Sequence, residues 1–233
     1  MLQEEGFARL RQARVAVFGV GGVGGYACEA LVRSGVRRID LFDSDEVSLS
    51  NLNRQIIALQ STVGQDKVAV MAARLRDIDP DVEVGGRRMF YLPENADEID
   101  LAQYDYVVDA VDTVAAKVEL AVRCDKLGVP LIAAMGAGNK LDPSKLQISD
   151  IYRTSVCPLA RAMRTTLRKK GVKRLTVAYS TEEPVRPLPA QAAQDAPRKD
   201  VPASMVFVPA AMGLLMASHI VRELALSPGS GAE

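Results

Sequence analysis

A glycine-rich turn, GVGGVGG at residues 19–25, follows the apolar run VAVF and precedes a segment with the pattern of a helix. Gly19, Gly21 and Gly24 fit the spacing GxGxxG. Glycines at this spacing allow a tight turn and let backbone N–H groups approach a phosphate at the helix N-terminus. The turn therefore favours a nucleotide-binding site in a strand–turn–helix unit. The alternative is that the glycines serve close packing alone.

Strand and helix patterns alternate along the chain. Short β-branched runs predict strands at 14–19, 38–43, 82–90, 104–112 and 130–138, and helical patterns lie between them at 22–34, 64–79 and 115–128. This order predicts an α/β fold, a Rossmann-like, doubly wound and mostly parallel sheet. The later elements that we expect are a basic helix and turn at 157–174, a strand at 175–181, and a strand or turn followed by a closing helix at 204–225.

The length of the chain, 233 residues, suits one large α/β domain. We therefore predict a single domain over residues 1–233, with a nucleotide-binding core at 14–150 and a C-terminal extension at 151–233 that faces the substrate. Within this extension, residues 182–203 are rich in Pro, Ala and charged residues, which predicts a mobile loop.

No segment of the sequence predicts export or membrane insertion. The N-terminus has no apolar signal core, and the longest apolar run, near residues 205–217, is too short to cross a bilayer and is interrupted by Pro209. The three cysteines form no CxxC pair, which excludes a four-cysteine zinc site within the chain and favours a reducing compartment. We expect a cytoplasmic protein that spans no membrane.

Charged side chains near the predicted strand ends distinguish between two kinds of nucleotide. Asp43 ends the second strand, where a carboxylate can bind the ribose of NAD or of ATP. Arg54 in SNLNRQ and Lys67 in VGQDK add two cations, although either one alone could be solvated surface charge. Two cations suit a triphosphate better than a dinucleotide. Asp112 ends the fourth strand, where a carboxylate could hold Mg²⁺ against the phosphates.

Four motifs in order, GVGGVGG, LFDSDEVSLSNLNRQ, VGQDKV and DAVDT, resemble the ThiF/MoeB/HesA superfamily of ubiquitin-activating-like adenylating enzymes. Members of this superfamily use ATP and Mg²⁺ to adenylate a carboxylate, so that AMP becomes its leaving group and pyrophosphate is released. The resemblance implies that Asp43 binds the ribose and that Arg54 and Lys67 bind the phosphates. Asp112 would bind Mg²⁺ and would act in catalysis together with the two cations. The residues implied to bind the nucleotide are Gly19, Gly21, Gly22, Gly24, Asp43, Asn51, Arg54, Gln55, Lys67, Asp112 and Thr113.

The second half of the chain resembles the branch of this superfamily that modifies tRNA. The matching segments are MGAGNKLDPSKLQISDIYRTSVCPLARAMRTTLRKKGVKR and SMVFVPAAMGLLMASHIV. The resemblance implies that a homodimer cyclises threonylcarbamoyladenosine in tRNA by adenylating the threonyl carboxylate, and it allows a sulfur-transfer protein as a partner. Relatives carry an arginine on a helix before the first strand that reaches the partner subunit's ATP. Arg9, Arg11 and Arg14 stand in a different context, so either another arginine serves or the N-terminus is truncated.

A run of cations supports a tRNA partner independently of the resemblance. The net charge is zero, so no global field attracts nucleic acid and any such site must be local. A patch of this kind can follow the phosphates of RNA, and the alternative is a solvated helix face. The predicted tRNA patch consists of Arg161, Arg164, Arg168, Lys169, Lys170, Lys173 and Arg174.

Three other functions stay open on the sequence. The chain could adenylate the C-terminus of a ubiquitin-like sulfur-carrier protein, but enzymes of that kind usually carry two CxxC pairs. It could be a NAD-dependent oxidoreductase because of GxGxxG and Asp43, but no catalytic histidine or tyrosine constellation is evident. It could also be a nucleotide-binding module without catalytic activity.

Overall fold

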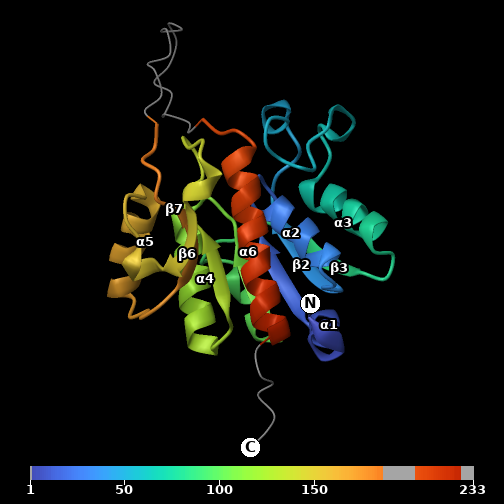
Figure 1. The fold of residues 1–233 in the computed structure, drawn as a ribbon, viewed down its shortest axis with the longest axis horizontal. Coiled ribbons are helices and arrows are strands. Elements are labelled where there is room, and N and C mark those ends of the chain that lie inside the picture. Colours follow the sequence, from blue (N-terminus) through green and yellow to red (C-terminus); the bar gives the residue numbers. More distant parts are fainter. Residues whose placement is uncertain (1, 186–202, 227–233) are drawn as a thin grey trace, which may run out of the picture.

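A seven-stranded sheet forms the centre of the structure, a computed structural model that describes residues 2–185 and 203–226 (Figure 1). The strands lie in the order β3-β2-β1-β4-β5-β7-β6, and all neighbours are parallel except β7 and β6. This arrangement confirms the predicted doubly wound, mostly parallel sheet. The strands are β1 (Arg14–Phe18), β2 (Arg38–Asp43), β3 (Glu83–Arg88), β4 (Tyr106–Asp109), β5 (Leu131–Ala134), β6 (Leu146–Asp150) and β7 (Thr176–Ser180).

Helices cover both faces of the sheet (Figure 1). They are α1 (Gln3–Gln12), α2 (Gly24–Arg33), α3 (Lys67–Ile78), α4 (Val114–Leu127), α5 (Pro158–Lys169) and α6 (Phe207–Leu226). Helices α1, α2, α3 and α6 share one hydrophobic core with Val15 and Val17 of β1, whereas α4 and α5 share a second core with Ala16 and Phe18. Because successive side chains of a strand point to opposite faces, β1 contributes to both cores.

The winding of the chain changes sides between β1 and β4. The chain leaves β1 into α2 on one face, and it leaves β4 into α4 on the other face. Ligands of open α/β sheets bind at this switch point, beyond the carboxyl ends of the strands. The predicted strand at 104–112 is too long, because β4 ends at Asp109 and residues 110–113 line a pocket instead.

Two elements of the structure were absent from the sequence prediction. Helix α1 precedes β1, carries Glu4 and Glu5 in its first turn, and buries Leu10. Strand β6 is a half-buried edge strand, which pairs only with β7, so it lacks the continuous apolar run of the central strands. Most of the predicted loop at 182–203 lies outside the described residues, and the division of the domain at residue 150 stays a prediction.

The apolar run near residues 205–217, which we expected to be too short to cross a bilayer, is part of the longer helix α6. The run continues as one helix of 20 residues, the only helix of the described residues long and apolar enough to cross a membrane. Pro209 lies in its first turn, where the missing N–H breaks no hydrogen bond within the helix. Met212, Met216 and Ile220 are fully buried in the core that α6 shares with α2. Packing within the domain therefore accounts for part of this apolar composition, and one such helix is weak evidence for a membrane location.

The buried face of α6 gives a prediction for stability. Met216→Ala should lower the free energy of unfolding by about 2–5 kcal/mol, because it removes a fully buried side chain and leaves a cavity. Leu214→Ala on the same helix is the matched control, since Leu214 is 51% exposed. It should change the free energy by less than about 0.5 kcal/mol. Urea unfolding followed by circular dichroism measures both, and equal effects would contradict the packing of α6.

Candidate active site

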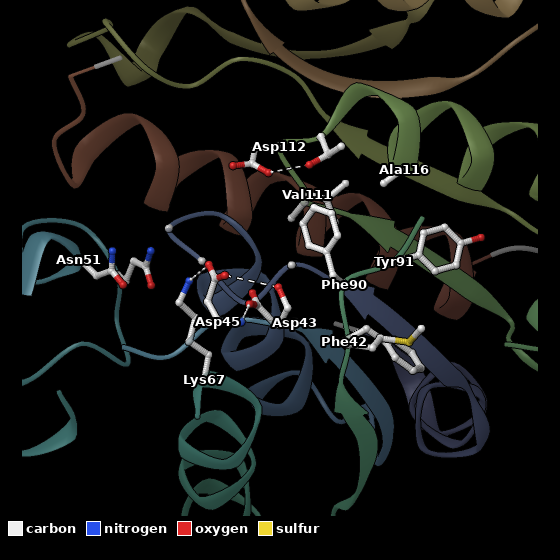
Figure 2. Close-up of a pocket in the computed structure, with 18 of the residues that line it drawn as sticks. Phe42, Asp43, Asp45, Asn51, Lys67, Phe90, Tyr91, Val111, Asp112 and Ala116 are labelled. Carbon is white, nitrogen blue, oxygen red and sulfur yellow. Dashed lines mark hydrogen bonds and ion pairs between the residues drawn. The ribbon is translucent and has the colours of Figure 1, made fainter. Parts of the chain in front are cut away.

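A pocket of ≈ 350 Å³ opens at the carboxyl ends of β1, β2 and β4, beside the glycine-rich turn (Figure 2). Every residue that the sequence predicts to bind the nucleotide lines this pocket, except Gly24. The predicted residues that line it are Gly19, Gly21, Gly22, Asp43, Asn51, Arg54, Gln55, Lys67, Asp112 and Thr113. Four segments that are distant in sequence thus meet at the switch point of the sheet.

Two glycines of the turn are required by the backbone. Gly19 has a φ of +89°, and a Cβ atom there would lie 2.6 Å from the carbonyl oxygen of Ala110, just beyond β4. A Cβ atom at Gly24 would lie 1.8 Å from the carbonyl oxygen of Gly19. Gly24 therefore serves close packing of α2 against the turn, whereas Gly19 lets the turn approach the end of β4.

Asp43 joins the end of β2 to the glycine-rich turn. Its Oδ2 accepts a hydrogen bond from the N–H of Val20 (2.7 Å), and its Oδ1 accepts one from the N–H of Asp45 (2.9 Å). Each carboxylate oxygen has a second acceptor direction, so the hydroxyl of a ribose can still donate to Asp43. The position suits the predicted ribose contact, and the same carboxylate fixes the shape of the turn.

Lys67, the first residue of α3, presents its ammonium to the pocket beside a carboxylate that the sequence analysis missed. Its Nζ lies 2.7 Å from Oδ2 of Asp45, and its backbone N–H donates to the carbonyl oxygen of Asp45 (3.1 Å; Figure 2). The Lys67 side chain is 6% exposed and that of Asp45 is 64% exposed. Asp45 thus orients a nearly buried cation, which a phosphate could approach from the open side of the pocket. Its place two residues after Asp43, just beyond the end of β2, could have pointed to Asp45 in the sequence.

Arg54 is oriented by the loop that carries it. Its Nη1 donates to the carbonyl oxygen of Ser50 (2.7 Å) and to Oδ1 of Asn53 (3.0 Å). Asn51 is buried, and its side-chain oxygen accepts from the N–H of Ser48 (3.1 Å), which closes the same loop. Asn51 therefore shapes the loop, and the guanidinium of Arg54 is held at the wall of the pocket.

The side-chain amide of Gln55 has an unsatisfied atom at the pocket. Gln55 is buried, and its Oε1 has no hydrogen-bond partner among the described residues. Its Nε2 lies beside the turn, 3.7 Å from where a Cβ atom of Gly21 would be. A buried polar atom without a partner is costly. This atom therefore supports a polar ligand next to the glycine-rich turn.

Asp112 lies across the pocket from Lys67, in the turn between β4 and α4 (Figure 2). Its Oδ1 accepts from the hydroxyl of Thr113 (3.3 Å), and Thr113 is the N-cap of α4. The described residues contain no group of three or more His, Cys, Asp and Glu side chains that could hold a metal ion. Asp112 offers a carboxylate to the pocket, and a carboxylate can hold Mg²⁺ together with phosphate oxygens.

Aromatic side chains that the sequence analysis did not single out form an apolar part of the pocket (Figure 2). Phe42 stacks on Phe18, with ring centroids 4.6 Å apart, and Tyr91 meets Phe18 edge to face at 4.9 Å. Phe90 lines the pocket and is 52% exposed. Such a wall suits a purine base. Phe90 and Tyr91 follow β3, which ends at the same edge of the sheet as β2, and this arrangement of the strands places both rings at the pocket.

The predicted tRNA patch lies on α5 and the turn after it. Most of its members are exposed and form no ion pair within the described part of the chain, namely Arg161, Arg168, Lys169, Lys170, Lys173 and Arg174. Arg164 differs, because it is half-buried and its Nη1 donates to the carbonyl oxygen of Thr154 (3.0 Å). The structure therefore favours a structural role for Arg164.

The densest part of this patch lies at the other end of the sheet from the pocket. Helix α5 starts near the carboxyl end of β5, where Sγ of Cys157 is 3.7 Å from the place of a Cβ atom on Gly136. It ends before β7, which begins at Thr176 and runs parallel to β5. Residues 169–174 therefore lie at the amino ends of the strands, whereas the pocket lies at the carboxyl ends.

The N-terminal arginines also lie away from the pocket of this chain. Helix α1 carries Arg9 and Arg11 and leads into the amino end of β1, opposite to the glycine-rich turn (Figure 1). Arg9 donates a hydrogen bond to the carbonyl oxygen of Ala225 in α6. The helix before the first strand is thus present, and it is fixed to α6.

The comparisons with known proteins agree with this site. A family model described as the ThiF family matches residues 1–230. The chain is 45% identical to the tRNA threonylcarbamoyladenosine dehydratase of Bacillus subtilis, over 95% of this chain and 90% of that protein. It is 34% identical to the Escherichia coli enzyme of the same name, over 95% and 89%. The crystal structure of the E. coli enzyme in complex with ATP superposes with a TM-score of 0.86, at 34% identity over 95% of this chain and 89% of that chain. The resemblance that the four motifs indicated is confirmed, and the chain belongs to the ThiF family.

Proposed function

We propose that this chain is an ATP-dependent tRNA threonylcarbamoyladenosine dehydratase, which adenylates the threonyl carboxylate of the modified nucleoside and then closes a ring. The observation that carries the proposal is the pocket at the switch point, where Arg54, Lys67 and Asp112 surround the space beside the glycine-rich turn. The similarity over most of the chain to enzymes of this name, and to one solved with ATP, supports the same nucleotide and substrate.

The residues suit a reaction at the α-phosphate. An oxygen of the threonyl carboxylate forms a bond to the α-phosphorus, and the bond from that phosphorus to the bridging oxygen breaks as pyrophosphate leaves. Arg54 and Lys67 would stabilise the charge that develops on the departing phosphates. Asp112 would hold Mg²⁺, which would supply further positive charge at the departing phosphates.

The second step would need no group from the enzyme to bond to the substrate. An atom of the ureido group attacks the activated acyl carbon, AMP leaves with one carboxylate oxygen, and the ureido group loses a proton. The tRNA thereby loses the elements of water, and ATP becomes AMP and pyrophosphate. The protein would contribute by holding the ureido group close to the acyl carbon.

The exposed cations of α5 support a large substrate. Their distance from the pocket would let them contact tRNA phosphates remote from the nucleoside that reacts. We also propose that the enzyme acts as a homodimer in the cytoplasm, as the family resemblance implies. Phe207 and Leu214 of α6 are 54% and 51% exposed and offer apolar surface for a second copy. A sulfur-transfer protein as partner stays a prediction from the resemblance.

Substitution of Lys67 and of Asp112 tests their roles in the reaction, provided that the variants still fold. Lys67→Ala and Asp112→Ala should each lower kcat by about 10²–10³-fold, because each removes charge that acts on the departing phosphates. The assay is mass spectrometry of nucleosides after incubation with ATP, Mg²⁺ and tRNA that carries threonylcarbamoyladenosine. Lys126→Ala, an exposed change at the end of α4, is the control and should keep full activity. Unfolding of both pocket variants would point to structural roles instead.

The α5 cations can be tested by charge reversal. Lys169→Glu combined with Lys170→Glu should raise the KM for tRNA and leave the KM for ATP unchanged, because these residues lie far from the pocket. The slope of log affinity against log salt should fall in magnitude by roughly one to two. Arg76→Glu on α3 is the control, since it reverses an exposed charge at the other side of the molecule (Figure 1). Equal changes in both KM values would argue against a tRNA contact here.

A pyrophosphate exchange experiment distinguishes the proposed dehydratase from an enzyme that activates a carrier protein. Pyrophosphate exchange into ATP that depends on modified tRNA supports the proposal. Exchange that depends on a ubiquitin-like carrier protein, and not on tRNA, supports activation of a carrier C-terminus instead. Tight binding of NAD without binding of ATP would favour an oxidoreductase.

A further inference from the structure

A fully buried ion pair lies directly behind the pocket. Nζ of Lys117 in α4 is 2.9 Å from Oδ1 of Asp109 at the end of β4, and both side chains are 0% exposed. Removal of two charges from water is costly, and apolar side chains of similar size often stabilise a protein as well or better. Stability is therefore a poor explanation for this pair.

The contacts of the pair converge on the turn between β4 and α4. Nζ of Lys117 also donates to the carbonyl oxygen of Val111 (3.1 Å), while the N–H of Val111 donates to Oδ1 of Asp109 (3.2 Å). Both backbone groups of Val111 are thus held by the pair. The backbone N–H of Lys117 donates to the carbonyl oxygen of Thr113 (3.1 Å). Asp112 lies between these two fixed residues.

The same turn supports the glycine-rich turn. Ala110 donates its N–H to the carbonyl oxygen of Phe18 (2.7 Å), and the carbonyl oxygen of Ala110 occupies the space where Gly19 has no side chain. A shift at residues 109–111 would therefore move both walls of the pocket. Burial raises the pKa of Asp109, and Lys117 acts in the opposite direction. Oδ2 of Asp109 is buried without a hydrogen-bond partner in the described residues, so the pair is not optimised for stability.

We propose that Lys117 and Asp109 are positioning residues for the candidate active site, which hold the turn from Ala110 to Thr113 so that Asp112 faces the pocket. This inference rests on the proposed function, because it assigns to Asp112 a role with ATP and Mg²⁺. Loss of the pair would free the backbone of Val111, and the carboxylate of Asp112 would lose its fixed direction. The effect would fall on the Mg²⁺-dependent reaction more than on the fold.

A double variant separates positioning from stability. Asp109→Leu combined with Lys117→Met replaces the pair by apolar side chains of similar size and leaves no buried charge. Its thermal midpoint should equal or exceed that of the wild type. Its kcat should fall by about 10-fold to 100-fold, and the Mg²⁺ concentration for half-maximal rate should rise by about 10-fold, as is typical when groups that orient a metal ligand are lost. The affinity for AMP, measured by calorimetry without Mg²⁺, should fall by a smaller factor than the Mg²⁺ concentration for half-maximal rate rises.

Two further variants complete the experiment. Lys117→Met alone leaves Asp109 buried without its cation, so its thermal midpoint should fall below that of the double variant. Lys126→Met, exposed on the same helix, should keep wild-type values throughout. A double variant with wild-type kcat and Mg²⁺ dependence would overturn the proposal, and so would one that unfolds as readily as Lys117→Met. A wild-type protein that binds ATP but converts no modified tRNA would overturn the proposed function instead, which keeps the two failures distinct.

Discussion

The parallel pairing of β1 with β4 is the constraint on which the rest of the molecule depends. The register places Phe18 beside Asp109, so the two strands end at the same level. After β1 the chain continues into α2 on one face of the sheet, and after β4 it continues into α4 on the other face. The pocket is the crevice between these two connections. The crevice stays narrow because Gly19 has no side chain and the carbonyl group of Ala110 fills its place. Every other part of the site is built onto these two turns.

Two ion pairs at this site have different physical roles. The carboxylate of Asp45 is mostly exposed, so the pair with Lys67 is solvated on one side and can admit a phosphate as a second partner of the cation. The pair of Asp109 with Lys117 has no contact with water, and separation of its charges would leave each one buried alone. Lys67 in the exposed pair can thus exchange Asp45 for a phosphate, whereas the buried pair of Asp109 with Lys117 suits a fixed support behind the pocket.

The exposed cations of α5 fit the proposed tRNA substrate better than a small one. A small carboxylic acid would need only the pocket, whereas an RNA can contact both the pocket and a charged surface at the opposite end of the strands. The extra elements β6, β7 and α5 create this surface by widening the sheet beyond β5. Helix α6 then fixes α1 and α2 on one face, since its buried methionines lie in the same core.

The sequence by itself predicted the doubly wound, mostly parallel sheet and ten of the residues that line the pocket. The motifs follow strand ends, and carboxyl ends of parallel strands meet at one edge. Tertiary structure alone decided that Asp45 orients Lys67, that Phe90 and Tyr91 form an apolar wall, and that Lys117 reaches Asp109. It also decided that Arg164 is tied to the backbone. These contacts join side chains from segments that are distant in sequence, so the periodicity of a helix or strand does not predict them. Burial and hydrogen-bond partners exist only once the sheet has brought those segments together.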